Sequence, residues 1–206
     1  MEELALIGYS GHSYVVNDIF LSNGIKPSGY FEINEKTENP YRLKYLGKEN
    51  SIEALEYLSN TAYFIAIGDN ELRQLISNKI QSLIAVLPIN AIHNKASVSS
   101  TAIIGFGVMI GDGCIVNSCA KISEGVICNT QSVIEHECYV GPFSHVAPGA
   151  VLCGNVYVGS QSFVGARAVV KQGIKIGDNV TIGAGTVVIS DIPDNSVVVG
   201  NPQRFI

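Results

Sequence analysis

Charged residues are scarce in this chain of 206 residues, and they make up only 15% of it. The formal net charge is -5, and no run of Lys and Arg occurs, whereas a nucleic-acid-binding protein normally carries a basic patch. No apolar stretch approaches the length of a membrane span. The start, MEELALIGYSGHS, lacks the basic segment and long apolar core of a secretory signal. We therefore expect a cytoplasmic protein with neither a nucleic-acid partner nor a membrane span.

A disulfide framework and a zinc ribbon are also disfavoured. The cysteines are odd in number and contain no C-x-x-C pair; they are Cys114, Cys119, Cys128, Cys138 and Cys153. We expect reduced thiols packed as small apolar residues, and no metal site. Hydrophobic residues make up 47% of the chain, which is typical of a well-buried globular protein.

The first part of the chain, residues 1–88, alternates between strand and helix patterns. Apolar runs at residues 4–8, near 28–33 and at 62–68 predict strands. Helices are expected before Asn23-Gly24, after a cap at Asn50, and at residues 70–82. The apolar face of the last helix is expected to comprise Leu72, Leu75, Ile76 and Ile80. This alternation predicts a small parallel α/β domain of the Rossmann-like type, whose strand-to-helix turns are suited to binding a ligand.

The second part, residues 89–206, follows a period of six. Every sixth position from Ile92 is aliphatic except Cys128, without insertion, and residues four positions later are mostly small and uncharged. The aliphatic series is Ile92, Val98, Ile104, Ile110, Val116, Ile122, Cys128, Ile134, Val140, Val146, Leu152, Val158, Val164, Val170, Ile176, Ile182 and Val188. Such a period over about a hundred residues is the hexapeptide signature of a parallel β-helix.

This repeat resembles that of the hexapeptide-repeat acyltransferases, and the resemblance implies a left-handed β-helix with eighteen residues per coil. A narrower group is similar to the whole chain: the sialic-acid O-acetyltransferase (NeuD) and UDP-4-amino-sugar N-acetyltransferase (PglD)-like family. Four stretches carry this likeness: GYSGHSYVV, AIGDNELR, NTQSVIEHECYVGPFSHVAPGAVLCGNV and VVGNPQRFI.

The eighteen-residue repeat makes His136 the strongest catalytic candidate. Gly154 stacks one coil beyond His136, about 4.8 Å away, so a bare backbone N–H is expected beside the imidazole. A base next to such a donor suits acyl transfer, in which the donor stabilises the oxyanion. Glu137 is expected to accept a hydrogen bond from one imidazole nitrogen and fix the tautomer. His93 is interpreted as structural.

The resemblance implies the remaining roles. It implies a cytoplasmic acetyl-CoA-dependent transferase of surface-glycan biosynthesis that acetylates the amine of a UDP-4-amino-4,6-dideoxy sugar, with active sites between the subunits of a homotrimer. It places His145, Gly165, Ala166 and Ala184 at acetyl-CoA. It places Gly11, His12 and Gly68 at the nucleotide sugar, and Glu32 and Asn34 where family members often carry paired aspartates.

Three alternatives remain open from the sequence. The same machinery would also serve O-acetylation of a sialic-acid-type sugar. A γ-type carbonic anhydrase shares the β-helix but needs three histidines that converge on zinc, and His93, His136 and His145 lack suitable spacing. A non-catalytic β-helix, such as an ice-binding module, would show flat Thr or Asn ladders and would not need an α/β domain.

Overall fold

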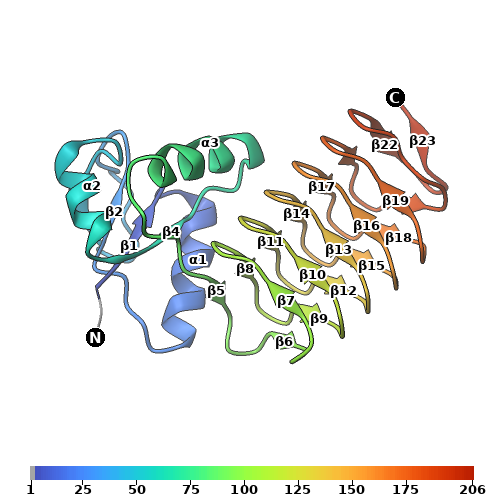
Figure 1. Cartoon of the computed structure of the whole chain (residues 1–206), viewed down its shortest axis with the longest axis horizontal. Coiled ribbons are helices and arrows are strands. Elements are labelled where there is room, and N and C mark those ends of the chain that lie inside the picture. Colours follow the sequence, from blue (N-terminus) through green and yellow to red (C-terminus); the bar gives the residue numbers. More distant parts are fainter. Residues whose placement is uncertain (1–2) are drawn as a thin grey trace. The chain divides into compact units, whose positions relative to one another are not determined.

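The computed structural model describes residues 3–206, which form two compact units, one ending at Ala91 and one running from Ile92 to Ile206. A four-stranded parallel sheet with the order β3-β2-β1-β4 lies at the centre of the first unit (Figure 1). Its strands are β1 (Leu4–Ile7), β2 (Gly29–Phe31), β3 (Lys44–Gly47) and β4 (Ala62–Ile65). The helices of this unit are α1 (Gly11–Ser22), α2 (Ile52–Ser59) and α3 (Asn70–Gln81).

Helices cover both faces of this sheet because successive strand residues point to opposite sides. On one side, Phe20 of α1 packs edge-on against Phe64 of β4, with ring centroids 5.9 Å apart. On the other side, residues of α2 and α3 share a buried cluster with the sheet. That cluster comprises Ala5, Ile7, Phe31, Ala54, Leu58, Tyr63, Ile65 and Ile80.

Two local expectations for this unit were wrong, and one strand was not expected. The cap of α2 is Ser51, not Asn50, and its side chain accepts a hydrogen bond from the Ala54 amide. Strand β3 was missed because its residues are half-buried or exposed, and its sequence contains no apolar run that would predict a strand. Helix α3 buries Arg73, Ser77 and Ile80, whereas Leu72 and Leu75 are 45% and 63% exposed.

The second unit is a parallel β-helix with three sheet faces (Figure 1). The first face contains β5 (Ala91–Ile92), β8 (Met109–Ile110), β11 (Ile127–Cys128), β14 (His145–Val146), β17 (Phe163–Val164), β20 (Thr181–Ile182), β22 (Val197–Val199) and β23 (Arg204–Phe205). The second contains β6 (Ser97–Val98), β9 (Ile115–Val116), β12 (Val133–Ile134), β15 (Val151–Leu152), β18 (Val169–Val170) and β21 (Val187–Val188). The third contains β7 (Ile103–Ile104), β10 (Lys121–Ile122), β13 (Tyr139–Val140), β16 (Tyr157–Val158) and β19 (Lys175–Ile176).

The eighteen-residue repeat is confirmed through most of this unit. Val133 pairs with Val151, and Val151 pairs with Val169. The six-residue aliphatic series fills the interior, fully buried from Ile110 onward. The repeat shortens at the end, where Thr181 pairs with Val197 and β23 runs antiparallel to β22. The predicted class is confirmed: an α/β unit followed by a left-handed parallel β-helix.

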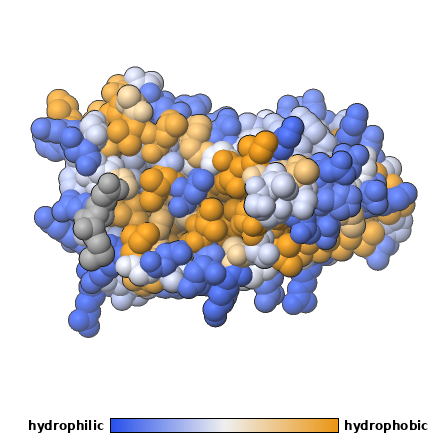
Figure 2. Space-filling view, turned by 60° about the horizontal axis from the view of Figure 1, so that its bottom comes forward, coloured by the Kyte–Doolittle hydropathy of each residue, from blue (hydrophilic) through white to orange (hydrophobic). Residues whose placement is uncertain are grey.

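Apolar side chains also form a band on the outside of the β-helix, as the space-filling view shows (Figure 2). Among residues 3–206, no helix is both long enough and apolar enough to cross a membrane.

Candidate active site

His136 and Glu137 form an exposed corner between β12 and β13. Their side chains are 51% and 65% exposed, and His136 Nδ1 lies 3.1 Å from Glu137 Oε2. The corner stacks on its neighbours through the backbone: the Glu137 amide donates to Ser118 O, and the Asn155 amide donates to His136 O. The Glu137 carboxylate thus holds the ring through Nδ1, which directs Nε2 away from it.

Gly154 lies against this imidazole from the next coil. A Cβ placed on residue 154 would be 2.5 Å from both Cε1 and Nε2 of His136, closer than real Cβ contacts come. The φ angle of Gly154 lies outside the left-handed region, so a side chain here would conflict with the position of the ring and not with the backbone conformation. The Gly154 carbonyl accepts from Gly173, whereas its N–H donates to no backbone or side-chain group within residues 3–206.

His145 occupies a different face, on β14, and is only 9% exposed. The side-chain amide of Asn129 lies 3.0 Å from its Nε2, and the Phe163 ring packs edge-on against it at 5.1 Å. Asn129 Oδ1 accepts from the Thr130 amide, so the nitrogen of Asn129 faces the imidazole and donates to it. Of these two histidines, His136 is therefore the one whose Nε2 is open to a substrate.

The other three residues expected at acetyl-CoA, besides His145, lie in two later coils. A Cβ at Gly165 would be 2.6 Å from the backbone nitrogen of Ala184, so close stacking alone accounts for this glycine. Ala166 is half-buried and Ala184 is exposed, and the Gly185 amide donates to Ala166 O across the two coils. Their role at the cofactor stays a prediction.

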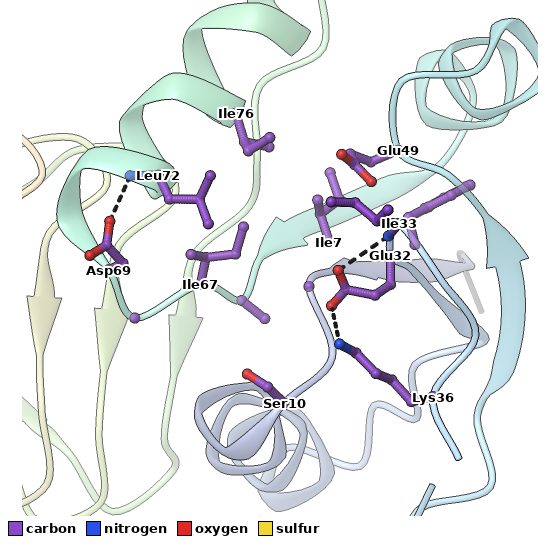
Figure 3. Close-up of a pocket in the computed structure, with 14 residues that line it drawn as sticks. Ile7, Ser10, Glu32, Ile33, Lys36, Glu49, Ile67, Asp69, Leu72 and Ile76 are labelled. Atoms are coloured by element: carbon purple, nitrogen blue, oxygen red, sulfur yellow. Dashed lines mark hydrogen bonds and ion pairs between the residues drawn. The ribbon is translucent and has the colours of Figure 1, made fainter. Parts of the chain in front are cut away.

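The first unit contains a pocket of about 350 Å³ at the carboxyl ends of β1, β2 and β4 (Figure 3). Ligands of open α/β sheets bind in this position, where the order of the strands reverses. The lining residues come from both sides of that crevice: Ile7, Gly8, Ser10, Phe31, Glu32, Ile33, Lys36, Glu49, Ala66, Ile67, Gly68, Asp69, Leu72 and Ile76.

Two residues expected to bind substrate line this pocket, namely Glu32 and Gly68. His12 packs on Gly68, where an added Cβ would lie 3.4 Å from the imidazole Cγ. Gly11 begins α1, and a Cβ there would meet nothing within 4 Å. Asn34 is exposed and is not among the lining residues.

A buried arginine that sequence reasoning missed shapes this loop. Nη1 of Arg73 donates to the carbonyl oxygens of Ile67, Gly68 and Asp69, at 3.1, 3.0 and 3.2 Å. Burial, together with the Arg73 charge, lowers the pKa of His12 from 6.5 to about 4, so this imidazole is neutral at pH 7. Arg73 lies within the stretch AIGDNELR, but the apolar pattern of this helix gave no sign that it is buried.

Cysteine chemistry is disfavoured next to the His136 corner. Cys138 points inward, its Sγ donates to the Cys153 carbonyl at 3.1 Å, and burial raises the pKa of its thiol to about 11. A neutral, buried thiol is a poor acyl carrier. All five cysteines are free, and Cys119 is exposed. Within residues 3–206, no group of three or more His, Cys, Asp or Glu side chains is placed to hold a metal ion.

Comparison with known proteins accounts for both units. Residues 3–80 match the PglD N-terminal domain, and residues 155–190 match the bacterial transferase hexapeptide (six repeats). The acetyltransferase domain of PglB from Neisseria gonorrhoeae, solved with acetyl coenzyme A, is 31% identical over 100% of this chain and 99% of that one, with a TM-score of 0.90. The chain belongs to the PglD-like acetyltransferase family.

Two further family members have named sugar substrates. PerB from Caulobacter crescentus, solved with CoA and GDP-perosamine, is 30% identical over 100% of this chain and 98% of that one, with a TM-score of 0.92. The GDP-perosamine N-acetyltransferase of Escherichia coli O157:H7 is 33% identical over 95 residues, which are 46% of this chain. The match spans only 42% of that curated relative's length.

Proposed function

We propose that this protein is an acetyl-CoA-dependent N-acetyltransferase that acts on the amine of a nucleotide-linked amino sugar. The observation that carries the proposal is the contact between His136 and Gly154. An exposed imidazole, held by Glu137 through Nδ1, lies directly against a glycine whose N–H is not used by residues 3–206. Those are the two groups that acyl transfer needs, a base and an oxyanion donor.

The chemistry follows from this arrangement. The sugar amine attacks the thioester carbonyl of acetyl-CoA, and Nε2 of His136 takes the proton that the amine loses. The Gly154 N–H donates to the oxyanion of the tetrahedral intermediate. That intermediate collapses to the acetamide as the C–S bond breaks, and the imidazolium of His136 gives the proton to the sulfur, so that CoA leaves as the thiol. Glu137 keeps the ring oriented and stabilises the imidazolium that forms.

The pocket of the first unit is proposed to hold the nucleotide. Helix α1 has no acidic residue in its first turn, and nothing within 4 Å of Gly11 requires glycine there. A diphosphate would gain from the positive end of the helix dipole at this helix start. The resemblance implied a UDP-4-amino-4,6-dideoxy sugar, whereas PerB was solved with GDP-perosamine, so both nucleotides belong in the test.

A homotrimer with shared active sites is supported by one face of the β-helix. Aliphatic side chains stack along its outside at eighteen-residue intervals: Ile115, Val133, Val151, Val169 and Val187. Ile115 and Val169 are each 37% exposed, and an apolar strip of this kind marks an interaction site. His136 follows Val133 by three residues, so a subunit packed on this strip would border the catalytic corner.

A screen of nucleotide sugars with acetyl-CoA tests the proposal. UDP- and GDP-linked 4-amino-4,6-dideoxy sugars and a sialic-acid acceptor should be compared, with the acetylated product detected by mass spectrometry. Product mass is preferable to thiol release alone because Cys119 is exposed and would react with thiol reagents. We expect an acetamide on the amino sugar. Acetylation only of a hydroxyl would favour the O-acetyltransferase alternative.

The free thiols also agree with the proposed cytoplasmic location.

A further inference from the structure

Three of the polar residues that line the pocket in the first unit are arranged in the order of the parts of a nucleotide. In Figure 3, Ser10 lies at the end next to α1, Glu32 lies in the middle, and Glu49 lies at the opposite end. If the diphosphate is bound at the start of α1, the ribose reaches Glu32 and the base reaches Glu49. This inference rests on the proposed nucleotide site and deepens it.

The Glu32 carboxylate already makes three polar contacts with neighbouring residues of the site. Its Oε2 accepts from the Tyr9 amide at 3.2 Å and lies 3.3 Å from Lys36 Nζ, and its Oε1 accepts from the Ile33 amide at 3.1 Å. The carboxylate therefore fixes the β1–α1 turn to the end of β2. Its remaining lone pairs suit ribose hydroxyls, the usual partners of an acidic residue at this position.

Glu49 differs from Glu32 in having no such partner. It is half-buried at the pocket wall, yet it forms no hydrogen bond or ion pair with any residue from 3 to 206. A carboxylate only accepts hydrogen bonds, and its two oxygens can accept a parallel pair. Both carboxylate oxygens of Glu49 are thus available to accept hydrogen bonds, at the end of the pocket where the base would lie.

Apolar side chains form the walls between these carboxylates. Ile33 is 60% exposed and Leu72 is 45% exposed, and both line the pocket with Ile67 and Ile76 (Figure 3). Such walls favour a flat ring, which would bury their exposed surface while its edge stays free for hydrogen bonds.

The hydrogen-bonding edges of the bases decide which ring fits. Guanine presents two adjacent donors, N1–H and the N2 amino group, which match the two oxygens of one carboxylate. Uracil and thymine present one N–H between two carbonyl oxygens, which would face a carboxylate oxygen unfavourably. Adenine and cytosine present an amino group beside a ring acceptor. We infer that Glu49 recognises guanine, which makes the substrate a GDP-linked sugar.

Calorimetric binding of GDP, UDP, dTDP and ADP to the full chain tests this inference. GDP should bind at least about tenfold more tightly than the other three, the scale of one bidentate pair. Glu49→Gln should weaken GDP binding by about tenfold or more, because its amide would bring a donor to a donor. Glu56→Gln, with the same charge change on the exposed side of α2, should leave GDP binding unchanged.

The outcomes separate the two proposals. If UDP, dTDP or ADP binds as tightly as GDP, or if Glu49→Gln retains the full preference for GDP, Glu49 does not select guanine, although the nucleotide site stands. If none of the four nucleotides binds, the proposed nucleotide site itself fails, and the inference about Glu49 fails with it.

Discussion

The imidazole of His136 and the α-carbon of Gly154 lie in adjacent coils, with no room between them for a side chain. A Cβ on residue 154 would be 2.5 Å from Cε1 and Nε2 of the ring. The eighteen-residue repeat predicted this relationship, and the distances show that the ring keeps its position only while residue 154 is glycine. It leads to the first prediction.

Gly154→Ala and Gly154→Val should displace the His136 ring while the β-helix stays folded. The φ of Gly154 is not left-handed, and valine is a strong strand former, so the backbone tolerates both changes. We expect turnover to fall at least about tenfold in the alanine variant and further in the valine variant. Melting temperatures should be recorded beside the rates.

Ser118→Ala is the matched control for these variants, because Ser118 occupies the same corner position one coil before His136. It should remain active. A folded Gly154→Val protein with wild-type turnover would show that the acetyl group binds elsewhere.

Glu137 is expected to act as a positioning residue for His136. Glu137→Gln retains an oxygen that can accept from Nδ1 but loses the negative charge that stabilises imidazolium, whereas Glu137→Ala loses both. Turnover should therefore fall in the order wild type, Gln, Ala, by roughly tenfold at the first step, with the KM for acetyl-CoA unchanged. An alanine variant as active as the wild type would remove Glu137 from the mechanism.

The aliphatic strip from Ile115 to Val187 should mediate assembly. Val151→Asp places a charge in the middle of this strip, so we expect light scattering to show a shift from trimer to monomer, with activity lost in parallel. Thr181→Asp, exposed on another face, is the control and should remain trimeric. A wild-type monomer that is fully active at nanomolar concentration would contradict shared active sites.

His12 should make the stability of the first unit sensitive to acid. Its folded pKa of about 4 lies below the ordinary value of 6.5, because it is buried and lies near Arg73. The unfolded chain therefore binds more protons between these values, and the free energy of unfolding should be about 2 kcal/mol lower at pH 5 than at pH 7 on this account.

Urea denaturation followed by tyrosine fluorescence checks this prediction, because all but two of the nine tyrosines precede residue 64 and the chain has no tryptophan. His12→Gln should remove most of the difference between pH 7 and pH 5. An unchanged pH dependence in that variant would mean that other groups cause it.

The sequence predicted the β-helix well because its signal is repeated in every coil. Position 134 is buried for the same reason as positions 116 and 152, so one pattern located the interior, the corners and the stacking of Gly154 on His136. The first unit offered no such repetition. Helix α3 showed an apolar stripe, yet Arg73 was buried instead of Leu72, because its guanidinium binds three loop carbonyls.

The pocket of the first unit was only partly foreseeable for a similar reason. The family resemblance pointed to Glu32 and Gly68, which line the pocket, and also to Gly11 and His12, which are not among its lining residues. Glu49 follows β3, a strand without an apolar signal, and it reaches the pocket only because β3 pairs with β2. The periodicity of the local sequence does not reveal that β3 pairs with β2.

The turnover of His136→Ala with acetyl-CoA and the amino-sugar nucleotide is the most direct test of the central claim that His136 is the catalytic base. We predict a loss of at least about a hundredfold, the scale of a positioned base, in a protein that melts like the wild type. His93→Ala, which removes a histidine in the first coil, should retain activity. A folded His136→Ala protein with near wild-type kcat would contradict the account, because the Glu-His-Glu corner would then be only solvent-exposed surface.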